Sequence, residues 1–197
     1  MLFPPINFGA VEEGLYRGAI PTEINVPFLE TLNLRTVVLL EHIAGTEEID
    51  PMWNSYLEEN QIELVRIGEE VNGSQMPPGT KSSQPISEEL VLRAMREVVH
   101  SSKYPLMIVD SLGKHRTGVL IACLRKLQKW NLSSVFSEYR RFASGKRKIQ
   151  NEQFIELFDV DLVNIPLQAP PFLQFNSASA IPVLSSKTVV AESNISV

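Results

Sequence analysis

Short apolar stretches alternate with longer stretches of mixed polarity along most of the chain. The apolar stretches have the length and the β-branched residues that are typical of buried strands. The mixed stretches favour helices with one buried face. Because the two kinds alternate, the pattern predicts a single α/β domain with a central, mainly parallel sheet flanked by helices. Strands are expected at 14–21, 36–40, 62–68 and 104–109, and helices at 22–33, 45–60, 87–102, 116–130, 133–143 and 151–159.

Local signals add detail to this pattern. Ser87 is expected to be the N-cap of the third helix, and Asn151 the cap of the last one, because both residue types accept hydrogen bonds from a first helical turn. The stretch at 104–109, "YPLMIV", is the most apolar of the predicted strands. We therefore place it at the centre of the sheet.

Two segments do not fit the alternation. Residues 69–86 are rich in Gly, Pro and Ser, which predicts a long loop, and long loops inside compact domains are often functional. Residues 166–197 begin with prolines and continue with Ser, Ala and Val but no charge cluster. We interpret them as a C-terminal tail that is partly or wholly disordered, which leaves residues 1–165 as the domain.

The composition is that of an ordinary soluble protein, with 44% hydrophobic and 21% charged residues in 197. No apolar run approaches the roughly 18 residues of a membrane helix, and no basic residue precedes the apolar positions of the N-terminus. The single cysteine, Cys123, excludes an internal disulfide and favours a reducing compartment, so we expect a cytoplasmic protein. The few histidines and the cysteine show no metal-site spacing, and no cofactor is expected.

Charge is distributed unevenly along the chain. Residues 111–148 hold ten lysines and arginines but one acid, Glu138, whereas the whole chain has a net charge of −5. A basic segment inside an acidic protein indicates a localised anionic ligand rather than nucleic acid. The alternative is that these cations simply form a solvated helix surface.

The chemistry is concentrated where the most apolar strand meets the next helix, in "MIVDSLGKHRTG" (107–118). Ligands of open α/β sheets bind beyond the carboxyl ends of the strands. Successive backbone N–H groups in a tight loop, together with a helix N-terminus, form an anion site. Gly113 permits an unusual backbone angle, and the planar guanidinium of Arg116 suits phosphate oxygens. A capped strand–helix turn without a ligand is the alternative.

This loop resembles the signature of the plant and fungal atypical dual-specificity phosphatases, a branch of the cysteine-phosphatase superfamily. "GKHRTG" followed by "LIACLRKLQKW" and "EYRRFASGKRK" carries the resemblance, and "FGAVEEGLYRGAIP" is similar to the family's opening motif. Within the family the chain most resembles the yeast oxidant-induced cell-cycle-arrest proteins. The resemblance implies the cysteine-phosphatase fold, and it implies that the loop binds phosphate through Ser111, Leu112, Gly113, Lys114, His115, Arg116 and Thr117.

The chain departs from the family signature at the catalytic position. The signature reads His-Cys-x-x-Gly-Lys-His-Arg-Thr-Gly, but Asp110 stands here in the place of the nucleophilic cysteine and Val109 in the place of the histidine. The loop at 69–86 also differs from that of active relatives. We expect Asp110 to accept the N–H bonds that a phosphate would take and to repel an incoming phosphate. Asp110 as an aspartyl nucleophile is an alternative that would require a metal ion.

Three functions follow from these observations. The first is a pseudophosphatase that acts as a binding or regulatory subunit, with related phosphatases as its partners in a hetero-oligomer. The second is a phosphatase of low activity towards phosphotyrosine or inositol pyrophosphates. The third is a sensor that binds an inositol polyphosphate without cleaving it. Cys123 lies well inside the next helix, so we expect it to be a small buried hydrophobe rather than a substitute nucleophile.

Overall fold

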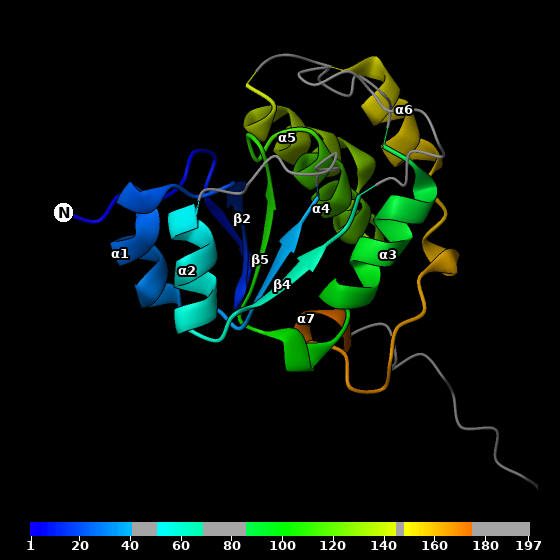
Figure 1. Ribbon diagram of the computed structural model, residues 1–197. Helices are drawn as coiled ribbons and strands as arrows, with labels where there is room; N and C mark the ends of the chain where they lie inside the picture. Colours follow the sequence, from blue (N-terminus) through cyan, green and yellow to red (C-terminus); the bar gives the residue numbers. More distant parts are fainter. Residues whose placement is uncertain (41–50, 69–85, 145–147, 175–197) are drawn as a thin grey trace, which may run out of the picture.

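A five-stranded sheet lies between two layers of helices (Figure 1). The computed structural model describes residues 1–40, 51–68, 86–144 and 148–174. The strands are β1 (Gly9–Glu12), β2 (Leu15–Ala19), β3 (Thr36–Leu39), β4 (Glu63–Arg66) and β5 (Leu106–Asp110). The helices are α1 (Val26–Leu29), α2 (Pro51–Glu59), α3 (Glu88–Val98), α4 (Arg116–Leu127), α5 (Leu132–Phe142), α6 (Ile149–Leu157) and α7 (Pro171–Gln174). Short 3-10 turns are η1 (Glu23–Asn25), η2 (Glu30–Leu32), η3 (Ser101–Lys103) and η4 (Val160–Leu162).

The sheet confirms the predicted fold class. Its strand order is β1-β2-β5-β3-β4, with β5 in the centre as the apolar sequence predicts. β2, β5, β3 and β4 pair in parallel, and only the edge strand β1 is antiparallel, through its pairing with β2. The prediction of one strand at 14–21 missed β1, which forms the first arm of this hairpin. Glu12 lies at an irregularity in the β1–β2 register.

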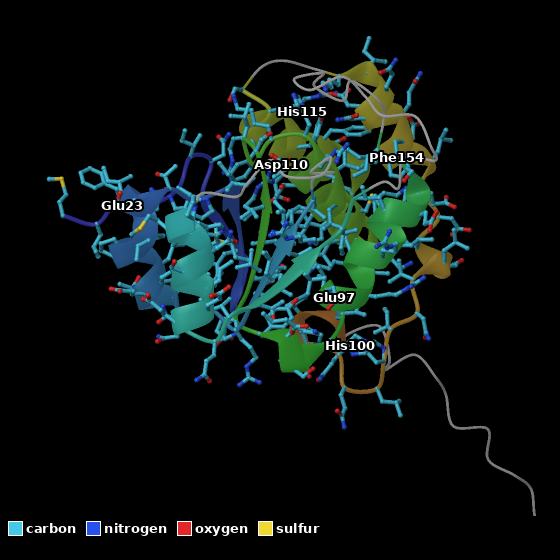
Figure 2. The ribbon with its side chains drawn as sticks, viewed as in Figure 1. Glu23, Glu97, His100, Asp110, His115 and Phe154 are labelled. Carbon is cyan, nitrogen blue, oxygen red and sulfur yellow. The ribbon has the colours of Figure 1, made fainter. Side chains whose placement is uncertain are left out.

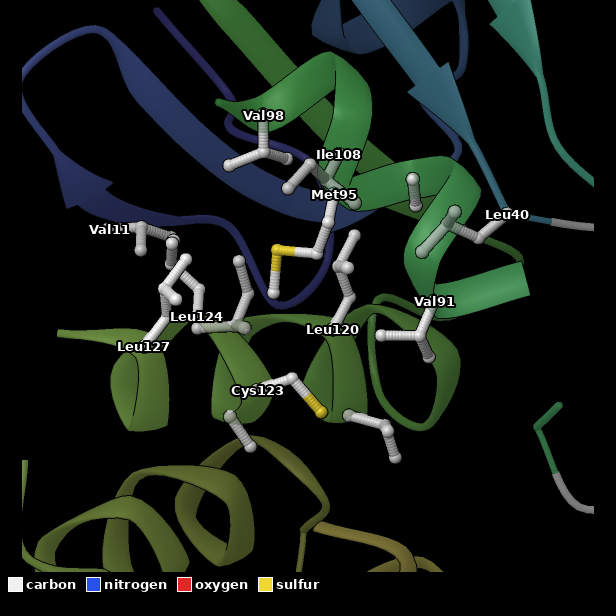
Figure 3. Close-up of a cluster of buried hydrophobic side chains, with 14 of the residues drawn as sticks. Val11, Leu40, Val91, Met95, Val98, Ile108, Leu120, Cys123, Leu124 and Leu127 are labelled. Carbon is white, nitrogen blue, oxygen red and sulfur yellow. The ribbon is translucent and has the colours of Figure 1, made fainter. Parts of the chain in front are cut away.

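Each face of the sheet is covered by its own set of helices, because the central strands are apolar on both sides. Figure 1 shows α1 and α2 on one face and α3 to α6 on the other. Val37 and Met107 face the first layer, whereas Val38 and Ile108 face the second. Figure 3 shows part of the hydrophobic core between the sheet and the second layer, in which Cys123 of α4 lies among buried aliphatic side chains.

Two predicted helix caps have different outcomes. The Ser87 side chain accepts a hydrogen bond from the N–H of Leu90, so it caps α3 as predicted. Asn151 was predicted to cap α6, and this is wrong because Lys148 is the N-cap. Asn151 instead lies buried in the helix, where its Nδ2 donates to the Tyr139 hydroxyl over 2.9 Å. A buried polar side chain needs such a partner, and sequence alone did not reveal it.

The start of the predicted tail packs on the domain. Ala169 and Leu173 are buried, and the ring of Phe172 lies 6.0 Å from that of Tyr104. Residues 175–197, which make up the rest of the predicted tail, lie outside the described residues, as does nearly all of the predicted loop at 69–86. Among the helices of the described part, none is long and apolar enough to cross a membrane.

Several cations of the basic segment have structural partners, which neither sequence interpretation anticipated. Arg125 is buried and forms ion pairs with Glu138 and Glu12. The Lys126 ammonium donates to three backbone carbonyls at the end of α6, over 2.7–2.8 Å. Arg140 pairs with Glu152 over 2.8 Å. These cations hold α4, α5 and α6 together, so they are neither a simple solvated surface nor, as a set, a ligand site.

Candidate phosphate-binding loop

The loop between β5 and α4 lies at the carboxyl end of the central strand, as the sequence predicts. Asp110 is the last residue of β5 and Arg116 is the first residue of α4, so five residues make the connection. Figure 2 shows Asp110 and His115 at the same end of the sheet. The start of a twelve-residue helix therefore lies at the end of the central, fully buried strand, which is the arrangement of an anion site.

The Asp110 carboxylate is held by the backbone of this loop. Its Oδ1 accepts from the N–H groups of Leu112 at 3.0 Å and Lys114 at 3.2 Å. Its Oδ2 accepts from the N–H of Thr117 at 2.9 Å. Asp110 is only 4% exposed, so these bonds replace most of its hydration. The first turn of α4 and the loop thus form a cradle for one anion, and the anion is the protein's own carboxylate.

Gly113 sets the path of the loop because it crosses directly over β2. Its φ is +65°, and a Cβ at this position would lie 2.4 Å from the carbonyl carbon of Gly18 and 2.6 Å from the nitrogen of Ala19. Two further bonds fix the loop: the Asn7 side chain donates to the Leu112 carbonyl at 2.8 Å, and the Ile20 N–H donates to the Asp110 carbonyl at 2.9 Å. The loop is therefore pressed onto β2 and the N-terminal segment.

The predicted phosphate-binding residues differ in how they lie. Ser111 and Leu112 are exposed, whereas Gly113 and Thr117 are buried and the remaining three are partly buried. The Arg116 guanidinium donates to the carbonyl of Leu40, the residue just beyond β3, at 3.4 Å. The structure therefore brings three N–H groups of the loop together around Asp110, and it places the side chain of Arg116 against the neighbouring strand.

Arg17 on β2 is a functional candidate that the sequence analysis missed. It is 1% exposed, and its Nη2 donates to the Gly113 carbonyl at 2.9 Å. Its guanidinium carbon lies 3.9 Å from the centre of the Phe142 ring. A signal was present in the sequence: Arg17 alternates with Leu15 and Ala19, so a charged residue occupies the face of the strand that is otherwise buried and apolar.

Cys123 does not take part in the site. It lies six residues beyond Thr117 along α4, which corresponds to about 9 Å of helix. It is fully buried, and this burial raises the pKa of its thiol well above the ordinary value. The prediction of a buried hydrophobe is confirmed. In the part of the chain that the structure describes, no group of three or more His, Cys, Asp or Glu residues lies close enough to hold a metal ion.

The sheet is covered by helices on both faces, and a loop that holds an anion joins its central parallel strand to a helix. This is the arrangement of the cysteine-phosphatase fold. Comparison with known proteins agrees, because the profile of the Tyrosine phosphatase family matches residues 2–174. The chain belongs to this family.

Named relatives include both tyrosine and inositol phosphatases. "Probable tyrosine-protein phosphatase DG1060" of Dictyostelium discoideum is 46% identical over 81% of this chain and 90% of its own length. Inositol diphosphatase DSP1 of Oryza sativa subsp. japonica is 38% identical over 81% of this chain and 67% of its own length. Among solved structures, the core catalytic domain of the PP-IP phosphatase SIW14 from S. cerevisiae is similar, with a TM-score of 0.70 and 35% identity. The match covers 82% of this chain and 90% of that domain.

We expect Gly113→Ala to destabilise the protein by about 2–4 kcal/mol, because a positive φ is unfavourable for Ala and its Cβ would clash with the backbone of β2. Gly14→Ala is the matched control, since its φ is +70° but the new Cβ would lie 3.5 Å or more from its neighbours. That control is expected to cost only about 1–2 kcal/mol. Denaturant unfolding measures both, and equal losses would contradict the close approach of the loop to β2.

We expect Cys123 to resist alkylation by iodoacetamide in the folded protein at pH 8, because burial both shields the thiol and raises its pKa. The same thiol should react within minutes in denaturant. Mass spectrometry of samples quenched over time measures the two rates. Rapid modification of the native protein would show that Cys123 is an accessible thiolate. It would contradict the conclusion that Cys123 cannot act as a nucleophile.

Proposed function

We propose that this protein is a pseudophosphatase, which has the phosphatase fold but acts by binding rather than by hydrolysis. The observation that carries the proposal is the placement of Asp110. Its carboxylate takes the N–H donors of Leu112, Lys114 and Thr117 in the loop that would otherwise hold a phosphate. The site is therefore filled by part of the chain itself.

The identity of the residue at the base of the loop supports this proposal. That mechanism needs a thiolate at the base of the loop, where the N–H groups and the helix N-terminus lower its pKa. The resemblance to the family signature aligns Asp110 with this position, and Cys123 is buried inside α4. A carboxylate nucleophile is the alternative, but both oxygens of Asp110 already accept hydrogen bonds from the backbone. Such bonds stabilise the carboxylate and make it a weaker nucleophile.

Electrostatic repulsion also opposes phosphate in the innermost position. Two unit charges about 4 Å apart interact by roughly 4 kcal/mol at an effective dielectric constant near 20. At 1.4 kcal/mol for each factor of ten, this corresponds to roughly a thousandfold loss of affinity. The repulsion weakens with distance, so it affects an inner phosphate most and the outer phosphates of a polyphosphate less.

The proposed role is that of a cytoplasmic regulatory subunit in a hetero-oligomer with a related, active phosphatase. Membership of the Tyrosine phosphatase family over residues 2–174 supports this role, because a related fold can associate with the partners of an active phosphatase. The second candidate is a phosphatase of low activity, which is favoured by the names of the relatives. An inositol polyphosphate held without cleavage is the corresponding ligand proposal.

We expect no turnover of an inositol pyrophosphate or of a phosphotyrosine peptide by the wild-type protein. Asp110→Cys is expected to gain weak activity, because the cradle remains, and Asp110→Ala none. Phosphate release by purified protein, measured with each substrate, tests this. The exposed Asp161 of η4 provides the control variant Asp161→Ala. Wild-type turnover that Asp110→Ala abolishes and Asp161→Ala does not would establish Asp110 as a nucleophile and overturn the proposal.

We expect Asp110→Ala to bind an inositol pyrophosphate more tightly than the wild type, by on the order of 100- to 1,000-fold, because the variant removes the inner negative charge. Isothermal calorimetry at fixed ionic strength measures the two affinities, with Asp161→Ala again as the control. Equal affinities for wild type and Asp110→Ala would show that the carboxylate does not exclude phosphate. The sensor function would then be the better interpretation.

A further inference from the structure

Arg17 is a charged residue in the interior of the domain, directly beneath the loop. It extends from β2 towards the first turn of α4, where its Nη2 would lie 3.6 Å from a Cβ built on Gly118. The Phe142 ring at the end of α5 covers the guanidinium. Burying a cation costs several kcal/mol unless charge and hydrogen bonds compensate for the lost hydration. Its presence therefore calls for an explanation.

Hydrogen bonding compensates Arg17 only in part. Nη2 donates to the Gly113 carbonyl, but Nε and Nη1 are buried and have no hydrogen-bond partner among the residues that the structure describes. A side chain that served only to brace Gly113 would not need a delocalised charge, because a neutral donor can hold a carbonyl. The charge itself is the feature to be explained.

Nearby charged residues influence how stable the positive charge of Arg17 is. Burial lowers the pKa of Arg17 to about 10, which still leaves it charged at neutral pH. Glu138 and Asp110 act in the opposite direction and favour the charged form, while Arg141 and Arg125 disfavour it. Glu138 is already hydrogen-bonded to Arg125 at 2.8 and 3.2 Å. Of these two carboxylates, Asp110 is the one for which the structure shows no ion pair among the residues that it describes.

We propose that Arg17 is the buried countercharge of the anion in the loop. Its charge stabilises the Asp110 carboxylate from beneath the loop, where it holds the Gly113 carbonyl, while the backbone N–H groups bind the same carboxylate directly. The anion can sit at a helix N-terminus inside the protein because a cation lies on the other side of the loop. This makes Arg17 a positioning residue, since it acts on the loop and its charge rather than on a substrate directly.

The countercharge also bears on which ligands the loop can bind. When Asp110 is replaced by Ala, the loop retains its N–H donors and Arg17 retains its charge, so the emptied cradle should bind a small oxyanion. Inorganic phosphate is the probe of choice, because its charge and its acceptor oxygens match those that Asp110 supplies. The inference rests on where the anion lies in the proposed site and not on the absence of hydrolysis.

The experiment measures phosphate affinity by calorimetry and by the rise in Tm with phosphate, in a set of Asp110→Ala variants at constant ionic strength. Asp110→Ala alone should bind phosphate, and adding Arg17→Met should weaken that affinity about tenfold or more. Adding Arg17→Lys, which keeps the charge, should restore most of it. Arg35→Met is the control, because Arg35 is exposed, donates to the Ser102 carbonyl and precedes β3 at the amino ends of the parallel strands, which is the end opposite to the loop.

The outcomes separate this inference from the proposed function. Equal phosphate binding with and without Arg17, or no binding to any Asp110→Ala variant, overturns the countercharge role and leaves the hydrolysis result unaffected. Equal behaviour of Arg17→Lys and Arg17→Met would show that Arg17 acts through packing, which also overturns it. Turnover by the wild-type protein would overturn the proposed function while leaving the Arg17 result to stand on its own.

Stability provides a second measurement in case Arg17→Met weakens the fold. We expect Arg17→Met and Asp110→Asn each to lower the Tm, because each leaves a buried charge without its partner. The double variant should lose clearly less than the sum of the two single losses, whereas Arg35→Met combined with Asp110→Asn should be additive. Additive losses for Arg17 and Asp110 would contradict the pairing.

Discussion

Three backbone N–H groups bound to one buried carboxylate are the interaction on which the rest of this structure depends. For Leu112, Lys114 and Thr117 to converge on Asp110, the chain must turn sharply between β5 and α4. That turn requires the positive φ of Gly113 and its close contact with the backbone of β2. The parallel pairing of β2 with β5 is therefore needed for the loop, because this pairing places Gly18 and Ala19 beneath the loop.

Several charged residues of the domain lie near the loop between β5 and α4. Arg125 joins Glu12 of the edge strand to Glu138 of α5, and Arg17 lies between this group and the loop. Each buried charge is tolerable because an opposite charge or a set of N–H dipoles lies near it. Residues of α4 and α5 also contribute to the buried hydrophobic core, so these helices are held by packing as well as by ion pairs.

The protein shares the scaffold of its family, and its own Asp110 carboxylate occupies the loop. Relatives named as tyrosine and inositol phosphatases share the fold over most of the chain. Here the loop is occupied by a side chain that is covalently part of the protein and cannot leave. The N–H donors of such a cradle are satisfied without a ligand. The same donors that hold Asp110 are those that a bound phosphate would need.

The sequence by itself determined the α/β fold, the central strand, the position of the loop, the cap at Ser87 and the buried state of Cys123. These features follow from local patterns, namely apolar runs, helical periodicity and residue types that favour particular backbone angles. It did not determine the hairpin strand β1, the role of Asn151, the ion pairs of the basic segment or the position of Arg17. Only the tertiary structure decided these, because each depends on residues distant in sequence: Arg17 meets Gly113, Arg125 meets Glu12, and Asn151 meets Tyr139. A charged or polar residue can be recognised in a sequence, but its partner is set by how the strands and helices pack.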